Sequence, residues 1–347
     1  MAIPISDEGT AHVQDGGAKR GPRPGSISVA LCVLNGERFL GEQLASISAQ
    51  VRPPDELVLV DDGSFDGTVV IARDFAASAP FPVRVYVNDR RLGVTKNFER
   101  ALGLCGGSMI AMCAHDDVWM PPKLLHLEEA LAAAPDAGLA FCDAEVVDGS
   151  LRPLGYRFWR AIGFGRRELA LVAAGRAFEP LLKRTFVGGT LSLFRSSYLD
   201  SILPIPATWQ EDSWIALVIA AQARLVAVPE PLSKYRQHGA NLVGGSKRGI
   251  LDQLNRSLAG GREAYELAAR QFEEARERLA GRPEVVDRPT WARDSRLLDE
   301  KIAHLRRRAG MSASRAARLP VLIEELCRGR YQKYSNGMRS FWRDFAA

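Results

Sequence analysis

The sequence lacks three features that would each place it in a special class: paired cysteines, a long apolar run and an export signal. Its five cysteines are odd in number and include no CxxC pair, so neither a zinc site nor a disulfide framework is indicated, and a reducing cytosol fits best. The longest apolar runs are broken within about ten residues, against about 20 needed to cross a bilayer. Residues 1–25 have no apolar signal core and predict a disordered leader. We therefore expect a cytoplasmic protein.

Charge is unevenly distributed along the 347 residues, whose net charge is +5. Residues 241–347 hold 22 Lys and Arg against 14 Asp and Glu, whereas the remainder holds 24 against 27. This basic C-terminal region suggests contact with something anionic, such as phospholipid or a phosphorylated carrier, although solvated helix faces are the simpler explanation. We expect no nucleic-acid partner. The length allows one large domain with an appendage, and we place the boundary near 245, giving a domain over 26–245 and a helical extension over 246–347.

Short apolar strands alternate with amphipathic helices in the first half of the chain. The pattern predicts strands over 27–34, 56–60, 83–87, 109–114 and 137–148, and helices over 38–50, 66–77 and 95–104. A further strand is expected over 188–194 and a helix over 211–223, and the pattern is helical and charged from 251 onward. Alternation of this kind predicts an α/β fold with a doubly wound, mostly parallel sheet.

Acidic pairs follow two of the predicted strands. Asp61 and Asp62 follow strand 56–60, and Asp116 and Asp117 follow strand 109–114, shortly before two prolines at which a helix restarts. Open α/β sheets bind ligands at the carboxyl ends of their strands. A dinucleotide-binding dehydrogenase would need a glycine-rich turn after the first strand, but Gly36 stands alone there. The alternative is a divalent ion held by carboxylates, which would neutralise a diphosphate leaving group.

Six motifs, in order, resemble the family 2 glycosyltransferases. They are LNGERFLGEQLASISAQ, VLVDDGSFDGT, LGVTKNFERAL, CAHDDVWMPPK, QEDSWIALVIAA and YRQHGANLVG. The resemblance covers about residues 27–244 and is strongest to the bacterial branch often called rhamnosyltransferase-like. It implies a GT-A fold, a nucleotide-sugar donor, a Mg²⁺ or Mn²⁺ ion and inversion at the anomeric carbon. It also implies a glycan or lipid-linked acceptor in cell-surface polysaccharide synthesis, with dTDP-rhamnose as the suggested donor and a UDP-hexose as the runner-up.

The resemblance assigns roles to ten residues. It implies that Asp212 is the catalytic base, with Glu211 the neighbour most easily confused with it, and that the metal ligands are Asp116, Asp117 and His238. Residues implied to bind the nucleotide sugar are Asn35, Asp61, Asp62, Lys96, Asn97 and Asp116. For each, a structural alternative stays open, because Asp-Gly-Ser is good turn chemistry and a helix N-terminus stabilises any carboxylate.

Two positions depart from the family pattern. Ala114 stands where many relatives carry another aspartate, and Leu34 stands where many place an aromatic side chain against the nucleobase. The first departure makes a non-catalytic nucleotide-sugar-binding relative the main rival, while the joint retention of Asp116, Asp117 and Asp212 favours an enzyme. A dehydrogenase ranks third.

Aromatic residues beside the proposed base and in the tail have two explanations each. Trp209 and Trp214 flank the Glu-Asp pair and could form an apolar wall for an acceptor sugar, although lone tryptophans are more often core. Residues 328–346 carry Tyr331, Tyr334, Met338, Phe341 and Phe345 at helical spacing among basic residues. Such a helix can lie on an anionic membrane or dock on its own domain, and docking is favoured.

Overall fold

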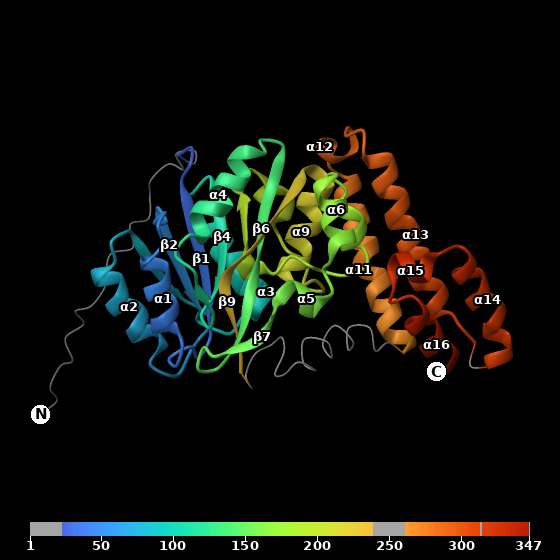
Figure 1. Cartoon of the computed structure of the whole chain (residues 1–347), viewed down its shortest axis with the longest axis horizontal. Helices are drawn as coiled ribbons and strands as arrows, with labels where there is room; N and C mark the ends of the chain where they lie inside the picture. Colours follow the sequence, from blue (N-terminus) through green and yellow to red (C-terminus); the bar gives the residue numbers. More distant parts are fainter. Residues whose placement is uncertain (1–22, 239–260, 313, 347) are drawn as a thin grey trace, which may run out of the picture.

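A nine-stranded mixed sheet forms the centre of the molecule in the computed structural model, which describes residues 23–238, 261–312 and 314–346 (Figure 1). The strand order is β3-β2-β1-β4-β8-β6-β9-β5, with β7 pairing β6 at the side. The strands are β1 (Ile27–Val33), β2 (Glu56–Asp61), β3 (Val83–Val87), β4 (Met109–Ala114), β5 (Val118–Trp119), β6 (Ala137–Asp148), β7 (Pro153–Arg157), β8 (Ser192–Arg195) and β9 (Arg224–Gln237). The predicted leader and the predicted boundary near 245 fall mostly or wholly outside the described residues.

The N-terminal half of the sheet is parallel, as the alternation predicts. Strands β3, β2, β1 and β4 pair in parallel, and β1, which lies between β2 and β4, is buried along its whole length. The connecting helices are α1 (Leu40–Ser48), α2 (Thr68–Ser78) and α3 (Val94–Leu104). Because the strand order reverses beside β1, the carboxyl ends of β1 and β4 flank the point where such sheets bind ligands.

The second half of the sheet is mixed, and here the sequence was a poorer guide. Strand β8 pairs antiparallel with both β4 and β6, and β5 pairs antiparallel with β9. The predicted strand over 188–194 is a 3₁₀ turn, η1 (Gly189–Leu191), followed by β8. Arg236 and Gln237 of the YRQHGANLVG motif end β9, a 14-residue strand parallel to β6 that the sequence pattern did not predict.

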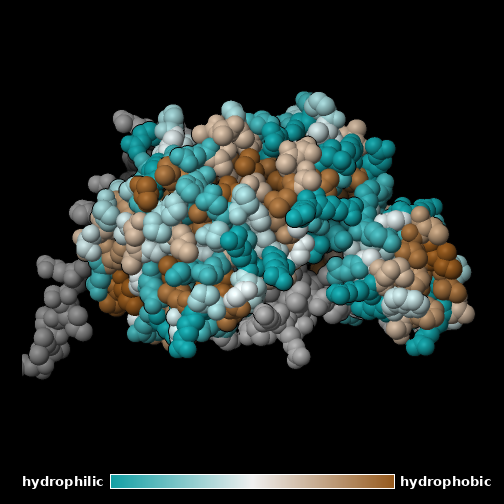
Figure 2. Space-filling model, viewed as in Figure 1, coloured by the Kyte–Doolittle hydropathy of each residue, from teal (hydrophilic) through white to brown (hydrophobic). Residues whose placement is uncertain are grey.

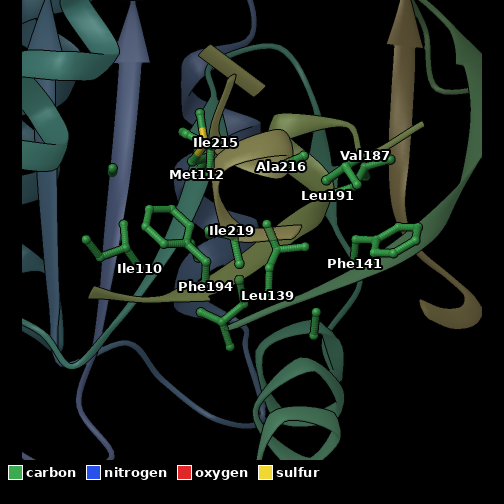
Figure 3. Packing of buried hydrophobic residues seen from close by; sticks show 14 of the residues in the cluster. Ile110, Met112, Leu139, Phe141, Val187, Leu191, Phe194, Ile215, Ala216 and Ile219 are labelled. Carbon is green, nitrogen blue, oxygen red and sulfur yellow. The ribbon is translucent and has the colours of Figure 1, made fainter. Parts of the chain in front are cut away.

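Further helices connect the strands of this half of the sheet. They are α4 (Lys123–Ala133), α5 (Phe158–Ile162), α6 (Arg166–Ala173), α7 (Phe178–Leu181), η2 (Ser196–Tyr198) and α8 (Leu199–Ile202). Helix α9 (Glu211–Gln222) follows them and is buried from Trp214 to Ala221. Its apolar side chains, Ile215, Ala216 and Ile219, lie against side chains of β4, β6, β8 and η1 (Figure 3). A helix that is apolar on all sides must be enclosed, and this enclosure fixes its first turn relative to the sheet.

The C-terminal helices gather at the end of the molecule opposite β3 and α2 (Figure 1). They are α11 (Arg262–Ala280), α12 (Pro283–Val286), α13 (Trp291–Ala309), α14 (Arg315–Cys327), α15 (Arg330–Tyr334) and α16 (Met338–Ala346). Ala275, Leu279 and Leu298 belong to the same apolar core as the sheet, so α11 and α13 are packed onto the α/β body. None of the helices in the described ranges is long and apolar enough to cross a membrane.

The tail docks on its own helices, as favoured from the sequence. The aromatic series is split between α15 and α16, because Gly337 takes a positive φ of 59° between them. Tyr331, Tyr334 and Phe341 are buried. Beneath them the Asp344 carboxylate accepts hydrogen bonds from Arg308, Tyr265 and Tyr331.

Candidate active site

The acidic pair after β2 holds loops in place. Asp61 accepts hydrogen bonds from the backbone amides of Gly63 and Ser64, at 3.0 and 2.9 Å, so its carboxylate closes its own turn. Asp62 accepts from the amides of Leu92 and Gly93, at 2.7 and 2.9 Å, and thereby fixes the segment that leads into α3. Both carboxylates are buried at the carboxyl end of β2. Their predicted contact with the nucleotide therefore stays a prediction, and their visible role is to shape the loops around it.

Asn35 joins the loops that follow β1 and β2. It takes a positive φ of 49°, which asparagine tolerates better than most residues. The backbone amide of Asn35 donates to the Ser64 hydroxyl at 2.7 Å, and its side-chain oxygen accepts from the backbone amide of Phe65 at 3.2 Å. This arrangement presents the Phe65 ring, 84% exposed, beside the end of β1. Leu34 precedes Asn35 and is partly buried.

Lys96 and Asn97 are both engaged with the protein. The Asn97 side chain donates to the Val60 carbonyl at 3.0 Å and accepts from Asn88 at 2.8 Å, which connects α3 to β2. The Lys96 ammonium donates to Glu99 at 2.7 Å and to the Ile205 carbonyl at 2.8 Å. The structure thus gives Asn97 a supporting place beneath the loops, whereas Lys96 fastens α3 to the segment before α9.

Asp116 and His238 come together from positions 122 residues apart. The Asp116 Oδ2 and His238 Nε2 atoms lie 3.1 Å apart, and both side chains are largely buried. Although burial acts in the opposite direction, the hydrogen bond from His238 and the nearby His115 hold the pKa of Asp116 below its ordinary value. A carboxylate oxygen suits Mg²⁺ and Mn²⁺, whereas an imidazole nitrogen suits transition metals better than Mg²⁺. The two side chains fit such an ion as neighbouring ligands.

Asp117 is held more tightly than its neighbour. Its Oδ2 accepts from the Thr190 hydroxyl at 3.0 Å and its Oδ1 from the Arg236 amide at 3.2 Å. Burial and then repulsion from Asp116 raise the pKa of Asp117 above its ordinary value. In the described ranges no group of three or more His, Cys, Asp or Glu side chains is arranged to hold a metal ion, so Asp116, Asp117 and His238 do not form a complete protein cage.

A buried cation supports Asp117 through Thr190. The Lys123 ammonium donates to the Thr190 carbonyl at 2.6 Å and to the Ser233 hydroxyl at 3.0 Å, and it lies 3.9 Å from the centre of the Trp119 ring. Burial lowers the pKa of Lys123 to about 8. Because burying an ammonium group is costly unless its hydrogen bonds are satisfied, this position rigidly links α4, η1 and β9.

Arg236 fixes the backbone at Asp116. Its guanidinium donates to the Asp116 carbonyl at 2.7 Å and to the Gly149 carbonyl at 2.8 Å, pairs with Glu42 of α1, and lies 4.4 Å from the centre of the Phe39 ring. The planar fork of arginine suits several acceptors at fixed angles. One buried side chain therefore holds together α1, the β6–β7 turn and the acidic motif.

Glu211 and Asp212 open α9 on the other side of η1. Asp212 Oδ1 accepts from the amide and hydroxyl of Ser213, and the backbone of Gly189 also bonds to the carboxylate. A Cβ on Gly189 would lie 3.1 Å from the Asp212 Cβ, which is tighter than ordinary contact, so this close approach favours glycine. Glu211 lies 3.4 Å from the Thr95 hydroxyl. Burial and then repulsion from Asp212 raise the pKa of Glu211 to about 7, and burial raises that of Asp212 as well.

The carboxylates converge on one end of the sheet. Thr190 of η1 donates to Asp117, and the adjacent Gly189 lies against Asp212, so both acids border η1. Burial, followed by the charges of Asp117, Asp116 and Asp212, raises the pKa of the Tyr235 hydroxyl in β9. Burial, and after it the charges of Glu211 and Asp62, raise the pKa of the Cys32 thiol near the end of β1. The predicted acidic motifs, 150 residues apart from Asp62 to Asp212 in the sequence, therefore lie toward the same end of the sheet.

The two tryptophans beside the Glu-Asp pair are core residues. Trp214 is fully buried and donates to the Ile202 carbonyl at 2.8 Å. Trp209 donates to the Gln271 carbonyl at 3.2 Å and packs against Phe272 of α11. The alternative of an exposed wall for the acceptor sugar was wrong for both.

Sequence reasoning did not single out three side chains of this site: Phe65, Lys123 and Thr190. Lys123 could have been noticed, because it lies on the same helical stripe as Leu124, Leu127 and Leu131, where a cation must be buried. Thr190 gave no such signal, since its bond to Asp117 depends on the sharp turn of η1.

The chain resembles known proteins in sequence and in fold. Residues 28–203 match the model of a protein family described as "Glycosyl transferase family 2". An uncharacterized protein of Mycobacterium tuberculosis is 28% identical over 61% of this chain, and an uncharacterized glycosyltransferase of Nostoc sp. is 25% identical over 67%. The matches cover 59% and 71% of those relatives, so the chain spans little more than half the length of the mycobacterial one.

Among solved structures, S. aureus TarS in complex with UDP-GlcNAc resembles this chain in fold. The TM-score is 0.53 at 16% identity, over 86% of this chain and 77% of the other. The architecture is thus the mixed α/β GT-A-like fold with C-terminal helices.

Proposed function

This chain belongs to glycosyl transferase family 2, and from that membership and the site geometry we propose that it transfers a sugar from a nucleotide-sugar donor to an acceptor hydroxyl with inversion at the anomeric carbon. The observation that carries the proposal is the placement of Asp212 and Asp117 against η1, where Gly189 lies against Asp212 and Thr190 donates to Asp117.

Asp212 is the proposed base. An inverting transfer needs a carboxylate that takes the proton of the acceptor hydroxyl while its oxygen attacks the anomeric carbon and the nucleoside diphosphate leaves. The raised pKa makes Asp212 a stronger base than an ordinary aspartate. The amide and hydroxyl of Ser213 bind one carboxylate oxygen and so fix its orientation. Because α9 is enclosed in the core, its first turn and Asp212 are held in a fixed position. Gly189, which has no Cβ, leaves room for the Asp212 side chain.

The donor nucleotide is proposed to lie over the ends of β1 and β2. Asn35, Asp61 and Asp62 shape the loops there, and Phe65 presents an exposed ring. Because Leu34 offers no aromatic face, we assign stacking on the nucleobase to Phe65, which comes from the adjacent loop. A face-on aromatic contact adds about 0.5–1.5 kcal/mol beyond area burial.

A divalent ion is proposed to be held by Asp116, with His238 beside it. When bound, Mg²⁺ or Mn²⁺ would neutralise the diphosphate charge. The Asp117 carboxylate accepts hydrogen bonds from Thr190 and Arg236, which hold it in position. Its proposed contribution to ion binding is its negative charge and the conformation that it gives to the acidic motif.

For the substrates, we propose dTDP-rhamnose or a UDP-hexose as donor and a glycan or lipid-linked acceptor of the bacterial cell surface, reached at the inner face of the membrane. A panel of nucleotide sugars should be screened by thermal shift and by metal-dependent release of the nucleoside diphosphate. Release with one donor, abolished by Asp212→Asn when acceptor is present, supports the transferase. Binding without release or transfer, for wild type and variant alike, would favour the non-catalytic relative.

A further inference from the structure

The outer faces of α14 and α16 carry apolar side chains that nothing in the described residues covers. Leu319 and Ile323 of α14 are 41% and 47% exposed, and Met338 and Trp342 of α16 are 44% and 58% exposed. Ala316, Pro320 and Cys327 continue the exposed face of α14. Apolar side chains gather visibly over the α14 end of the molecule (Figure 2). We call the four larger side chains the terminal apolar face.

The two helices present this face together. Arg315 at the start of α14 donates to the Ala346 carbonyl at 3.3 Å, and Arg318 donates to the Asp344 carbonyl at 3.0 Å, so the helices run antiparallel. Their inner sides enclose Leu322 and Phe341 in a small core. The terminal apolar face lies on the other sides of the same helices. An exposed apolar patch such as the one over α14 in Figure 2 marks a contact site.

The charges around the face are almost all positive. Arg315, Arg328 and Arg339 are exposed on α14, its C-terminal end and α16. Within 314–346 the acids are Glu324, Glu325 and Asp344, of which the last two are buried. Glu324 is paired with Arg307 and Arg328. The rim of the face is therefore basic.

This charge pattern decides between two occupants. In a symmetric dimer the same patch meets itself, so the basic rims of two copies would face each other, and like charges across an interface are repulsive. An anionic bilayer surface offers the complementary charge, and it accepts tryptophan and aliphatic side chains at the headgroup level. We propose that the terminal apolar face docks the protein on anionic phospholipid. This proposal does not rest on the transferase chemistry, because vesicle binding reports on the surface alone.

The position differs from the one that the sequence suggested. Tyr331, Tyr334 and Phe341 of the aromatic tail are buried and unavailable to lipid. Helix α14, which had no part in that expectation, supplies half of the face. A membrane contact here would leave the carboxyl ends of β1 and β4 at a distance along the molecule's long axis (Figure 1).

The test is flotation of the full chain with vesicles of phosphatidylglycerol and phosphatidylcholine in equal parts, compared with phosphatidylcholine alone. We expect flotation with the anionic vesicles only, weakening as salt is raised. Ile323→Glu should lower the partition coefficient about tenfold or more, because it removes an aliphatic side chain that the bilayer would bury and adds a negative charge. Arg339→Gln should lower it about fivefold.

Val70→Glu is the matched control, since Val70 is an exposed aliphatic residue of a helix, α2, at the opposite end of the molecule. It should float like wild type. If Ile323→Glu lowers the melting temperature, flotation of Leu319→Ser tests the same face with a milder substitution. Failure of wild type to float at low salt, or equal losses for Ile323→Glu and Val70→Glu, would overturn the proposal. So would a change from oligomer to monomer in Ile323→Glu without lipid, because it would identify an interface between copies.

Discussion

Asp212→Asn should show separately how the Glu-Asp pair affects the transfer rate and how it affects the free energy of unfolding. The substitution keeps the shape of the side chain and an oxygen that can accept the hydrogen bonds of Ser213. It removes the ability to take a proton. Positioned proton transfer contributes roughly 10²–10⁴ in rate, so transfer should fall by about that factor. Donor affinity should stay near that of wild type, because Asp212 lies on the proposed acceptor side.

The same substitution should stabilise the folded protein. The pKa of Glu211 is raised from 4.5 to about 7, and one pKa unit corresponds to about 1.4 kcal/mol, so the whole shift represents about 3 kcal/mol. Burial is the larger cause and repulsion from Asp212 the second, so removal of the charge at position 212 relieves part of this cost. Because both folded pKa values are raised, the pair lowers stability as pH rises through about 7, and the gain from Asp212→Asn should be largest above that pH.

Three measurements check this prediction: transfer rate, donor affinity by calorimetry, and the free energy of unfolding at pH 5 and pH 8. Glu211→Gln is the matched control, since it removes the neighbouring charge but not the proposed base. It should stabilise the protein similarly while transfer falls much less. A wild-type rate in Asp212→Asn, or a larger loss in Glu211→Gln, would show that the base is the other carboxylate. A loss of stability in Asp212→Asn would refute the reasoning about buried repulsion.

Further predictions concern the metal, the nucleobase and the C-terminal helices. Calorimetry should show donor binding at least about tenfold weaker in chelator, because a diphosphate facing carboxylates is repulsive. In Asp116→Asn the donor affinity should no longer depend on the metal. Equal affinity with and without metal in the wild type would remove the ion from the mechanism. Phe65→Ala should raise the donor dissociation constant about two- to tenfold while Phe65→Trp preserves it, and equal effects of both would exclude stacking. Asp344→Asn should lower the free energy of unfolding by about 3–5 kcal/mol in a denaturant titration, because it leaves Arg308 buried without its counter-charge; a change below about 1 kcal/mol would show that the pair is not needed for stability. The hydrogen bonds that hold the pKa of Asp344 low also mean that its stabilisation is present above the unfolded pKa and lost as pH falls.

The sequence by itself determined the parallel half of the sheet. Strands β1 to β4 are short apolar runs separated by amphipathic helices, and such local patterns state which residues must be buried. The acids could be placed for the same reason, since each pair directly follows one of these strands, and the carboxyl ends of parallel strands lie at one edge. Motif order alone then indicated the family that residues 28–203 match.

Only the tertiary structure decided how the second half of the chain completes the site. β9 is partly exposed and carries two prolines, so its pairing with β6 had no local signature. The partners of Asp116 and Asp117, which are His238, Arg236 and Thr190, come from 73 to 122 residues away. Such contacts follow from how strands pair across the sheet rather than from any nearby pattern. The tail shows the same division, because the spacing of its aromatics predicted a buried side, while the packing of α14 against α16 decided which apolar residues remained outside.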